Sequence, residues 1–165
     1  NWAVIAATIV VGVGLGWGLK PAPDSGWMAK VAAYQALYVP ATVSADTDAA
    51  NQSVQLDRVG AAIGIDFDGI DTAVPELTFV RAQILGDGDQ TIAQLVFRND
   101  AGTPVALCLI ENGDGPQATL TFKKMRGLSS LSWANATHQM LLIGGKTPGV
   151  LDDAAYRFQS HLGIS

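Results

Sequence analysis

The chain has 165 residues, 48% of them hydrophobic, which suffices for one domain with a core and is too short for two. Its formal net charge is −5 and its ten Lys and Arg residues are scattered apart from the pair Lys123 and Lys124, so it offers no basic face for nucleic acid. A single cysteine, Cys108, excludes an internal disulfide and a cysteine-based zinc site within the chain.

Residues 2–19 form an apolar segment without a charged residue. A helix of this length spans roughly 27 Å, close to the hydrocarbon thickness of a bilayer. Trp2 and Trp17 lie near its ends, where indole rings favour the interface between lipid and water. We therefore expect a transmembrane segment at residues 1–20 and a proline-containing linker at residues 21–26. A cleaved signal peptide and a buried element of a soluble domain are the alternatives.

Four glycines alternate with apolar residues in this segment, at Gly12, Gly14, Gly16 and Gly18. They form two pairs of small residues four apart, which let membrane helices approach closely. The same glycines weaken a helix by up to about 1 kcal/mol each in water, which would ease unwinding before intramembrane proteolysis. A membrane helix that merely tolerates glycine is equally consistent with this pattern.

Residues 27–165 are predicted to form one α+β domain. Apolar spacing predicts one helix at residues 28–38, stopped by Pro40, and a second at residues 55–63, closed by Gly64. A last helix is predicted by the apolar stripe of Leu151, Ala155, Phe158 and Leu162. Between them, strands are expected at residues 78–85, 91–98, 105–110, 119–125, 128–133 and 138–143. Helices, then hairpin-linked strands, then a helix are typical of an antiparallel sheet of about six strands with flanking helices.

The expected strand at residues 105–110 is apolar on both faces, which indicates a central position in the sheet. Cys108 lies within it. We therefore expect Cys108 to be a small, buried and reduced core thiol rather than a redox sensor.

The residues suited to catalysis or metal binding are few. His138 and His161 are the only histidines, and neither has a nucleophile or carboxylate motif around it. Residues 66–71 faintly resemble a calcium-binding loop, but the glycine comes two places early and Leu77 stands where the loop needs Glu. We expect a plain loop there, no enzyme activity, no metal and no cofactor.

Three stretches together resemble the extracytoplasmic domain of membrane-spanning anti-sigma factors. They are residues 34–38 followed by Thr42, the hairpin from residue 93 to Cys108, and Gly127-Leu128 with Trp133 before the strand at residues 140–144. The likeness covers most of residues 28–162, and the position of the apolar segment agrees with it. The order of the three stretches, rather than any single motif, carries the resemblance.

The resemblance implies a single-pass protein of the inner membrane with its C-terminal domain in the periplasm. A cytoplasmic domain outside this chain would hold a sigma factor inactive. The zinc-coordinating His and Cys residues usual in that domain are absent here, so this chain itself would not bind the sigma factor. This chain would then be the sensing or proteolysis-control half, with a regulatory protease or a periplasmic signal protein as its partner. A homodimer is left open. Since Asn1, not Met, is the first residue, we expect the chain to be processed or cut from a longer protein.

Tyr34, Gln35 and Tyr38 form the candidate interaction surface within the first of the three stretches. The alternative is that both tyrosines belong to the core. For the chain as a whole, the competing function is a membrane-anchored periplasmic domain that binds a small ligand in an apolar pocket with a few polar groups. An esterase-like hydrolase is the third and least favoured hypothesis.

Overall fold

The computed structural model of the protein describes residues 26–44, 48–147 and 149–163. Within these ranges no helix is both long and apolar enough to cross a membrane. The expected transmembrane segment, with Gly12, Gly14, Gly16 and Gly18, lies outside the described residues, as does the linker up to residue 25.

A six-stranded antiparallel sheet forms the centre of the domain, as the sequence predicts. In chain order the strands are β1 (Leu77–Asp87), β2 (Gln90–Asn99), β3 (Pro104–Glu111), β4 (Gln117–Met125), β5 (Leu128–Ala134) and β6 (His138–Gly144). Their order in the sheet is β1-β2-β3-β6-β5-β4. Two three-stranded meanders therefore meet where β3 pairs with β6, and β1 and β4 are the two edges.

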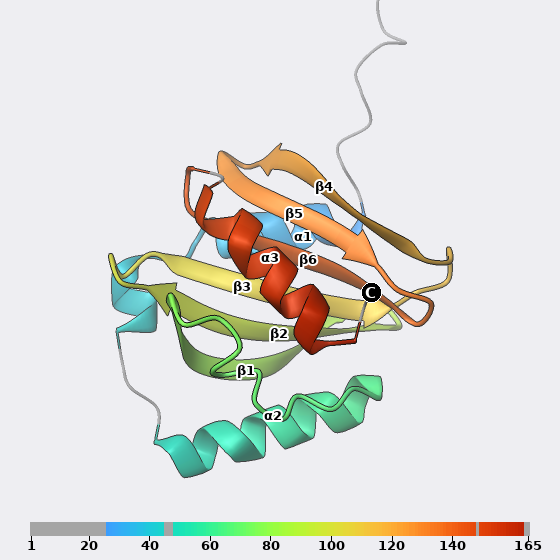
Figure 1. Ribbon diagram of the computed structural model, residues 1–165, viewed down its shortest axis with the longest axis horizontal. Helices are drawn as coiled ribbons and strands as arrows, with labels where there is room; N and C mark the ends of the chain where they lie inside the picture. Colours follow the sequence, from blue (N-terminus) through green and yellow to red (C-terminus); the bar gives the residue numbers. More distant parts are fainter. Residues whose placement is uncertain (1–25, 45–47, 148, 164–165) are drawn as a thin grey trace, which may run out of the picture.

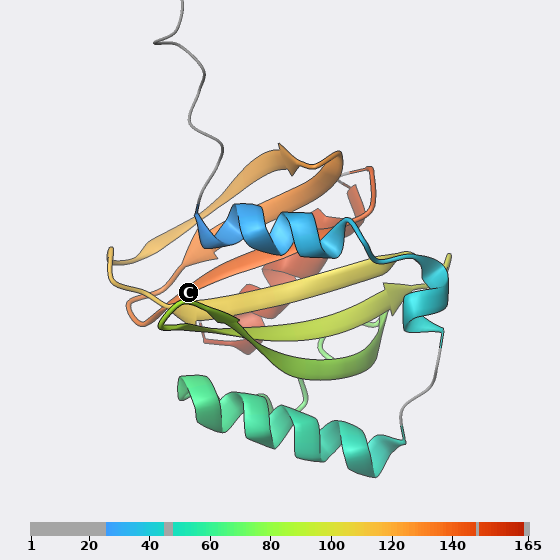
Figure 2. The same ribbon diagram turned by 180° about the vertical axis from the view of Figure 1, so that it is seen from behind.

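In the described residues, three α-helices and one short 3-10 helix surround the sheet: α1 (Trp27–Gln35), η1 (Pro40–Val43), α2 (Ala49–Ile63) and α3 (Gly149–His161). Figure 1 shows α3 across one face of the sheet, and Figure 2, from behind, shows α1 across the other. In both views α2 runs beside the β1 edge. The α+β class is therefore confirmed for the described part of the chain.

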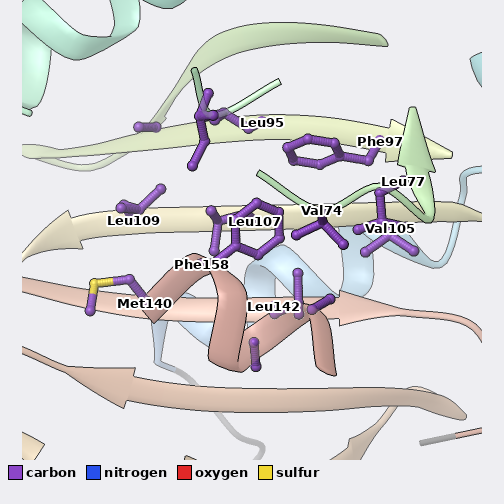
Figure 3. Packing of buried hydrophobic residues seen from close by; sticks show 14 of the residues in the cluster. Val74, Leu77, Leu95, Phe97, Val105, Leu107, Leu109, Met140, Leu142 and Phe158 are labelled. Carbon is purple, nitrogen blue, oxygen red and sulfur yellow. The ribbon is translucent and has the colours of Figure 1, made fainter. Parts of the chain in front are cut away.

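The alternation of side chains along the strands divides the core into two layers. On β3, Val105, Leu107 and Leu109 belong to the larger layer, which also contains Phe158 of α3 (Figure 3). The intervening residues of β3 belong to a second layer under α1, whose buried members are Trp27, Val31, Ala32, Ile92, Ala106, Cys108, Ile110, Met125, Leu141 and Ile143. The predicted central position of this strand, with Cys108 buried, is confirmed.

The first two helices differ in length from the sequence prediction. α1 ends at Gln35 rather than at residue 38, because the backbone N–H groups of Leu37 and Tyr38 donate to carbonyls three residues back, and the chain becomes extended at Val39 before the proline (φ −124°, ψ 164°). α2 begins at Ala49 rather than at residue 55, and its extra turns point Gln52, not an apolar side chain, toward the sheet. Its predicted end is confirmed, with Gly64 in the left-handed conformation (φ 69°).

α2 satisfies backbone groups that β1 leaves unpaired as an edge strand. The backbone N–H of Ala82 donates to Gln55 Oε1 at 2.9 Å, and Gln52 Nε2 donates to the carbonyl oxygen of Phe79 at 3.2 Å. These bonds bracket the register shift between Phe79 and Arg81. The opposite edge, β4, carries the exposed Lys123 and Lys124, whose charges disfavour pairing with another strand.

The contact between β3 and β6 requires glycine at position 144. A Cβ added there would lie 2.5 Å from the carbonyl oxygen of Pro104 and 2.8 Å from Cα of Val105. We predict that Gly144→Ala lowers the free energy of unfolding by about 1–3 kcal/mol in urea denaturation. Gly86→Ala in β1, where a Cβ meets nothing within 4 Å, is the control and should change stability by less than about 0.5 kcal/mol. Equal effects of the two substitutions would show that the strands separate easily at Gly144.

Candidate functional site

α1 and η1 are fixed to the sheet by a polar network around the phenol of Tyr38. Its hydroxyl accepts hydrogen bonds from Arg81 Nη2 at 3.0 Å and from Gln83 Nε2 at 3.1 Å. Gln83 Nε2 also donates to Oε1 of the buried Gln94 at 2.6 Å, and Arg81 Nη1 donates to the carbonyl oxygen of Thr42 at 3.2 Å. One tyrosine thus ties the segment after α1 to both β1 and β2.

The electrostatics of this network follow from its partial burial. Burial raises the pKa of the Tyr38 phenol above its ordinary value, and the Arg81 guanidinium acts in the opposite direction. That guanidinium also lies 5.3 Å from the centre of the Tyr38 ring, within the range of a cation–π interaction. Tyr38 therefore remains a neutral hydrogen-bonding group at physiological pH.

The three candidate interaction residues occupy different environments. Tyr34 is partly exposed and packs edge-to-face on Tyr38, with ring centroids 5.4 Å apart. Tyr38 is half-buried in the network, whereas Gln35 is 2% exposed. The most exposed apolar side chains of this region are instead Leu37 (73%) and Val39 (53%), which directly follow α1.

Gln35 lines a groove at one end of the sheet. The groove lies between the C-terminal end of α1, the β2–β3 turn and the connection from β6 to α3, and has a volume of about 590 Å³. The amide oxygen of Gln35 is buried and has no hydrogen-bond partner among the described residues. An amide oxygen buried without a partner costs about 1–3 kcal/mol of stability.

The other end of α1 is anchored by its first residue. Trp27 is buried, and its Nε1 donates to Gln139 Oε1 of β6 at 3.1 Å. Gln139 Nε2 in turn donates to Asn112 Oδ1 and to Asp114 Oδ2, each at 3.2 Å. Lys30 adds an ion pair with Asp87 of the β1–β2 hairpin. The residue that directly follows the expected linker is therefore bonded to a central strand.

The two histidines are engaged in separate structural contacts. His138 Nε2 lies 2.7 Å from the carbonyl oxygen of Ile63, and its Nδ1 lies 2.8 Å from the hydroxyl of Thr137. His161 Nε2 lies 2.8 Å from the carbonyl oxygen of Asp68. In the part of the chain that the structure describes, no three His, Cys, Asp or Glu side chains gather closely enough to hold a metal ion.

The loop at residues 66–71 contributes to the core. Phe67 and Ile70 are buried in the larger layer, and the backbone N–H of Asp68 donates to Asp66 Oδ1 at 3.0 Å. This is an Asx turn, in which the carboxylate accepts a bond from its own loop.

The sequence interpretation missed Gln94 and Gln139, which hold α1 in place from the sheet. Gln94 follows Ala93 and precedes Leu95 in the otherwise apolar run of residues 92–97, and it shares a face with Ile92 and Val96. A glutamine within an apolar row was the available signal, since a buried amide must find hydrogen-bond partners. Gln139 gave no comparable signal, because its partners come from α1 and from the β3–β4 turn.

Comparison of the chain with protein-family models, with curated proteins and with solved structures finds no match.

The Cys108 thiol is fully buried, and burial raises its pKa to about 12, with the adjacent Gln94 acting weakly in the opposite direction. Between pH 9 and 12 the unfolded chain loses the thiol proton while the folded chain keeps it, so this contribution to stability is complete below pH 9 and declines above it. We predict that the free energy of unfolding of the native chain, relative to Cys108→Ala, falls by about 1 kcal/mol from pH 9 to pH 10 and then approaches a slope of about 1.4 kcal/mol per pH unit.

Urea denaturation of both proteins at pH 8, 9 and 10 measures this difference, in which the titration of the remaining groups cancels. Labelling of the native thiol by an aromatic disulfide reagent should require denaturant. A parallel pH dependence of the two proteins, or rapid labelling in buffer, would contradict the buried thiol.

Proposed function

We propose that this chain is the transmembrane and extracytoplasmic sensor part of an anti-sigma factor, which controls sigma-factor release, and hence transcription, through regulated proteolysis. The observation that carries the proposal is the anchoring of Trp27. The first described helix begins directly after the linker and is bonded to β6 through Gln139. A conformational change in the periplasmic domain can thereby alter the segment beside the membrane.

α1 is suited to such a role because it is held by the sheet and not by its own sequence. It has nine residues, no side-chain cap at Gly26 and no acidic residue in its first turn. Isolated helices of this length are unstable in water, so α1 depends on burying Trp27, Val31 and Ala32 against the sheet. Separation of α1 from the sheet would therefore unfold it.

In this mechanism, undocking of α1 makes the chain between the membrane and the sheet a substrate for a regulatory protease. Cleavage there leaves a membrane stub whose glycines, at positions 12 to 18, favour further unwinding and a second cut within the membrane. The partners are the protease, or a signal protein that acts on α1, and a sigma factor bound by a cytoplasmic domain.

The proposal gives the domain no catalytic role. His138 and His161 make structural contacts with backbone or threonine oxygens, and Cys108 lies buried beneath α1. A membrane-anchored small-ligand binding domain without a sigma-factor partner is the second candidate, and the groove at Gln35 favours it.

The test is deletion of residues 27–165 from the full-length parent protein, with transcription from the sigma factor's target promoters as the readout. We predict constitutive transcription and rapid loss of the membrane stub, because the element that controls cleavage is gone. A stable stub with silent promoters would contradict the proposed control by the domain.

Two controls accompany the deletion. Alkaline phosphatase fused after residue 162 of the intact protein should be active, as expected of an exported domain. Tyr156→Ala, which removes an exposed side chain of α3, should leave transcription repressed.

A further inference from the structure

We infer that the groove at Gln35 binds a small anionic amphiphile, which has an apolar body, a hydroxyl or N–H donor and an acidic head group. Figure 2 shows the end of α1, with η1 after it, at the end of the sheet where the β2–β3 turn and the connection from β6 to α3 also lie. The groove has a volume of about 590 Å³, within the range of pockets that hold small organic molecules.

Apolar side chains supply much of the wall. Val39 and Pro40 come from the segment after α1, Val105 from β3, Leu128 from β5 and Leu151 from α3. Such a surface favours a hydrocarbon or ring system over a sugar or a free phosphate, because burial of apolar area drives the association.

Gln35 selects for a hydrogen-bond donor. Gln35 belongs to the wall of the groove and is 2% exposed, and its buried amide oxygen has no partner among the residues that the structure describes, so a ligand reaches this oxygen when the side chain turns toward the groove. A ligand with a hydroxyl or N–H near this amide completes it, whereas a purely apolar ligand leaves it unpaired. A water molecule could also complete the amide, and it would do so without selecting among ligands.

The charge of the groove wall favours an anionic ligand. The chain carries fifteen Asp and Glu residues and a net charge of −5, yet none of the acidic residues that the structure describes lines the groove. Lys146 is exposed and belongs to the wall near the start of α3. An acidic head group beside Lys146 gains electrostatic attraction, and a cationic ligand would meet repulsion there.

The role of this ligand as the signal of the sensor rests on the proposed function. Its binding to the groove does not. Gln35 is the last residue of α1, so a ligand held by Gln35 binds the docked helix and not the undocked one. Binding therefore stabilises docking by mass action, and loss of the ligand is the event that releases α1.

The test uses the full 165-residue chain in lipid nanodiscs, with 3-hydroxydecanoate, decanoate and decanol as probes and empty nanodiscs as the partition control. Binding is followed by NMR shifts of the Gln35 side-chain amide. We expect 3-hydroxydecanoate to bind roughly three- to tenfold more tightly than decanoate, because one hydrogen bond separates them. We expect decanol to bind more weakly than decanoate.

Two variants and a matched control separate the contributions. Gln35→Leu should still bind decanoate, which reports an intact groove, but the preference for the hydroxylated acid should fall to about one. Lys146→Ser should weaken both acids and leave decanol unchanged. Arg58→Ser changes the net charge equally on α2, outside the groove, and should bind as the native chain does.

Equal affinity of the native chain for the two acids would overturn the selection of a hydrogen-bond donor by Gln35. It would mean that ordered water alone completes this amide. A loss of acid binding in Arg58→Ser as large as in Lys146→Ser would overturn the head-group contact. Both results leave the deletion test of the proposed function unaffected. If 3-hydroxydecanoate binds but does not slow trypsin cleavage after Lys30 within α1, the binding site stands and its role as the signal is overturned.

Discussion

The burial of β3 on both faces is the constraint on which the rest of the domain depends. Residues 104–110 are all buried, and the strand has neighbours on both sides in the sheet. A strand of this kind cannot leave either face to water, because its apolar side chains point alternately in both directions. One face is covered by the layer that includes α3, so the other requires a second cover.

α1 supplies that second cover, which explains why so short a helix lies on the sheet at all. Trp27, Val31 and Ala32 close the layer that contains Cys108 and Leu141. Because the second face of β3 must be covered, the helix that completes the core is also the element that directly follows the expected membrane linker. A signal that alters the docking of α1 therefore need not travel through the rest of the fold.

The polar groups on the α1 face of the sheet determine position rather than stability. Tyr38, Gln83 and Gln94 share hydrogen bonds that fix η1 over β1 and β2. Gln35, three residues before Tyr38, has an unpaired amide oxygen and belongs to the groove wall. A fully apolar face would hold α1 in several registers, whereas hydrogen bonds among buried amides favour one arrangement. The resulting arrangement brings Gln35 to the groove wall.

The strands were predictable from the sequence to within two residues, because alternation and turn residues act locally. The two-residue turn at Gly88-Asp89 also fixes the register of β1 on β2, so the pairing of Gln83 with Gln94 was within reach of the sequence. The start of α2 was missed because Gln52, and not an apolar side chain, faces the edge of the sheet in the turns before residue 55.

The groove could not be predicted, for a different physical reason. It depends on the pairing of β3 with β6, which places Val105 opposite Gly144 although two strands, β4 and β5, lie between them in the sequence. Neither turn chemistry nor periodicity specifies a pairing between strands that are distant in sequence, and only the packed sheet brings the wall residues together.

The central claim is that α1 undocks from the sheet by itself, and trypsin cleavage after Lys30 within α1 tests it most directly. Met140 and Leu141 are adjacent buried residues of β6, and Leu141 faces α1 while Met140 faces the opposite layer. Replacement of either by Ala costs about 2–5 kcal/mol of stability. At matched global stability in urea, our account predicts cleavage at least about tenfold faster in Leu141→Ala than in Met140→Ala, because only Leu141 supports the helix. Equal cleavage rates, following global stability alone, would contradict independent undocking of α1.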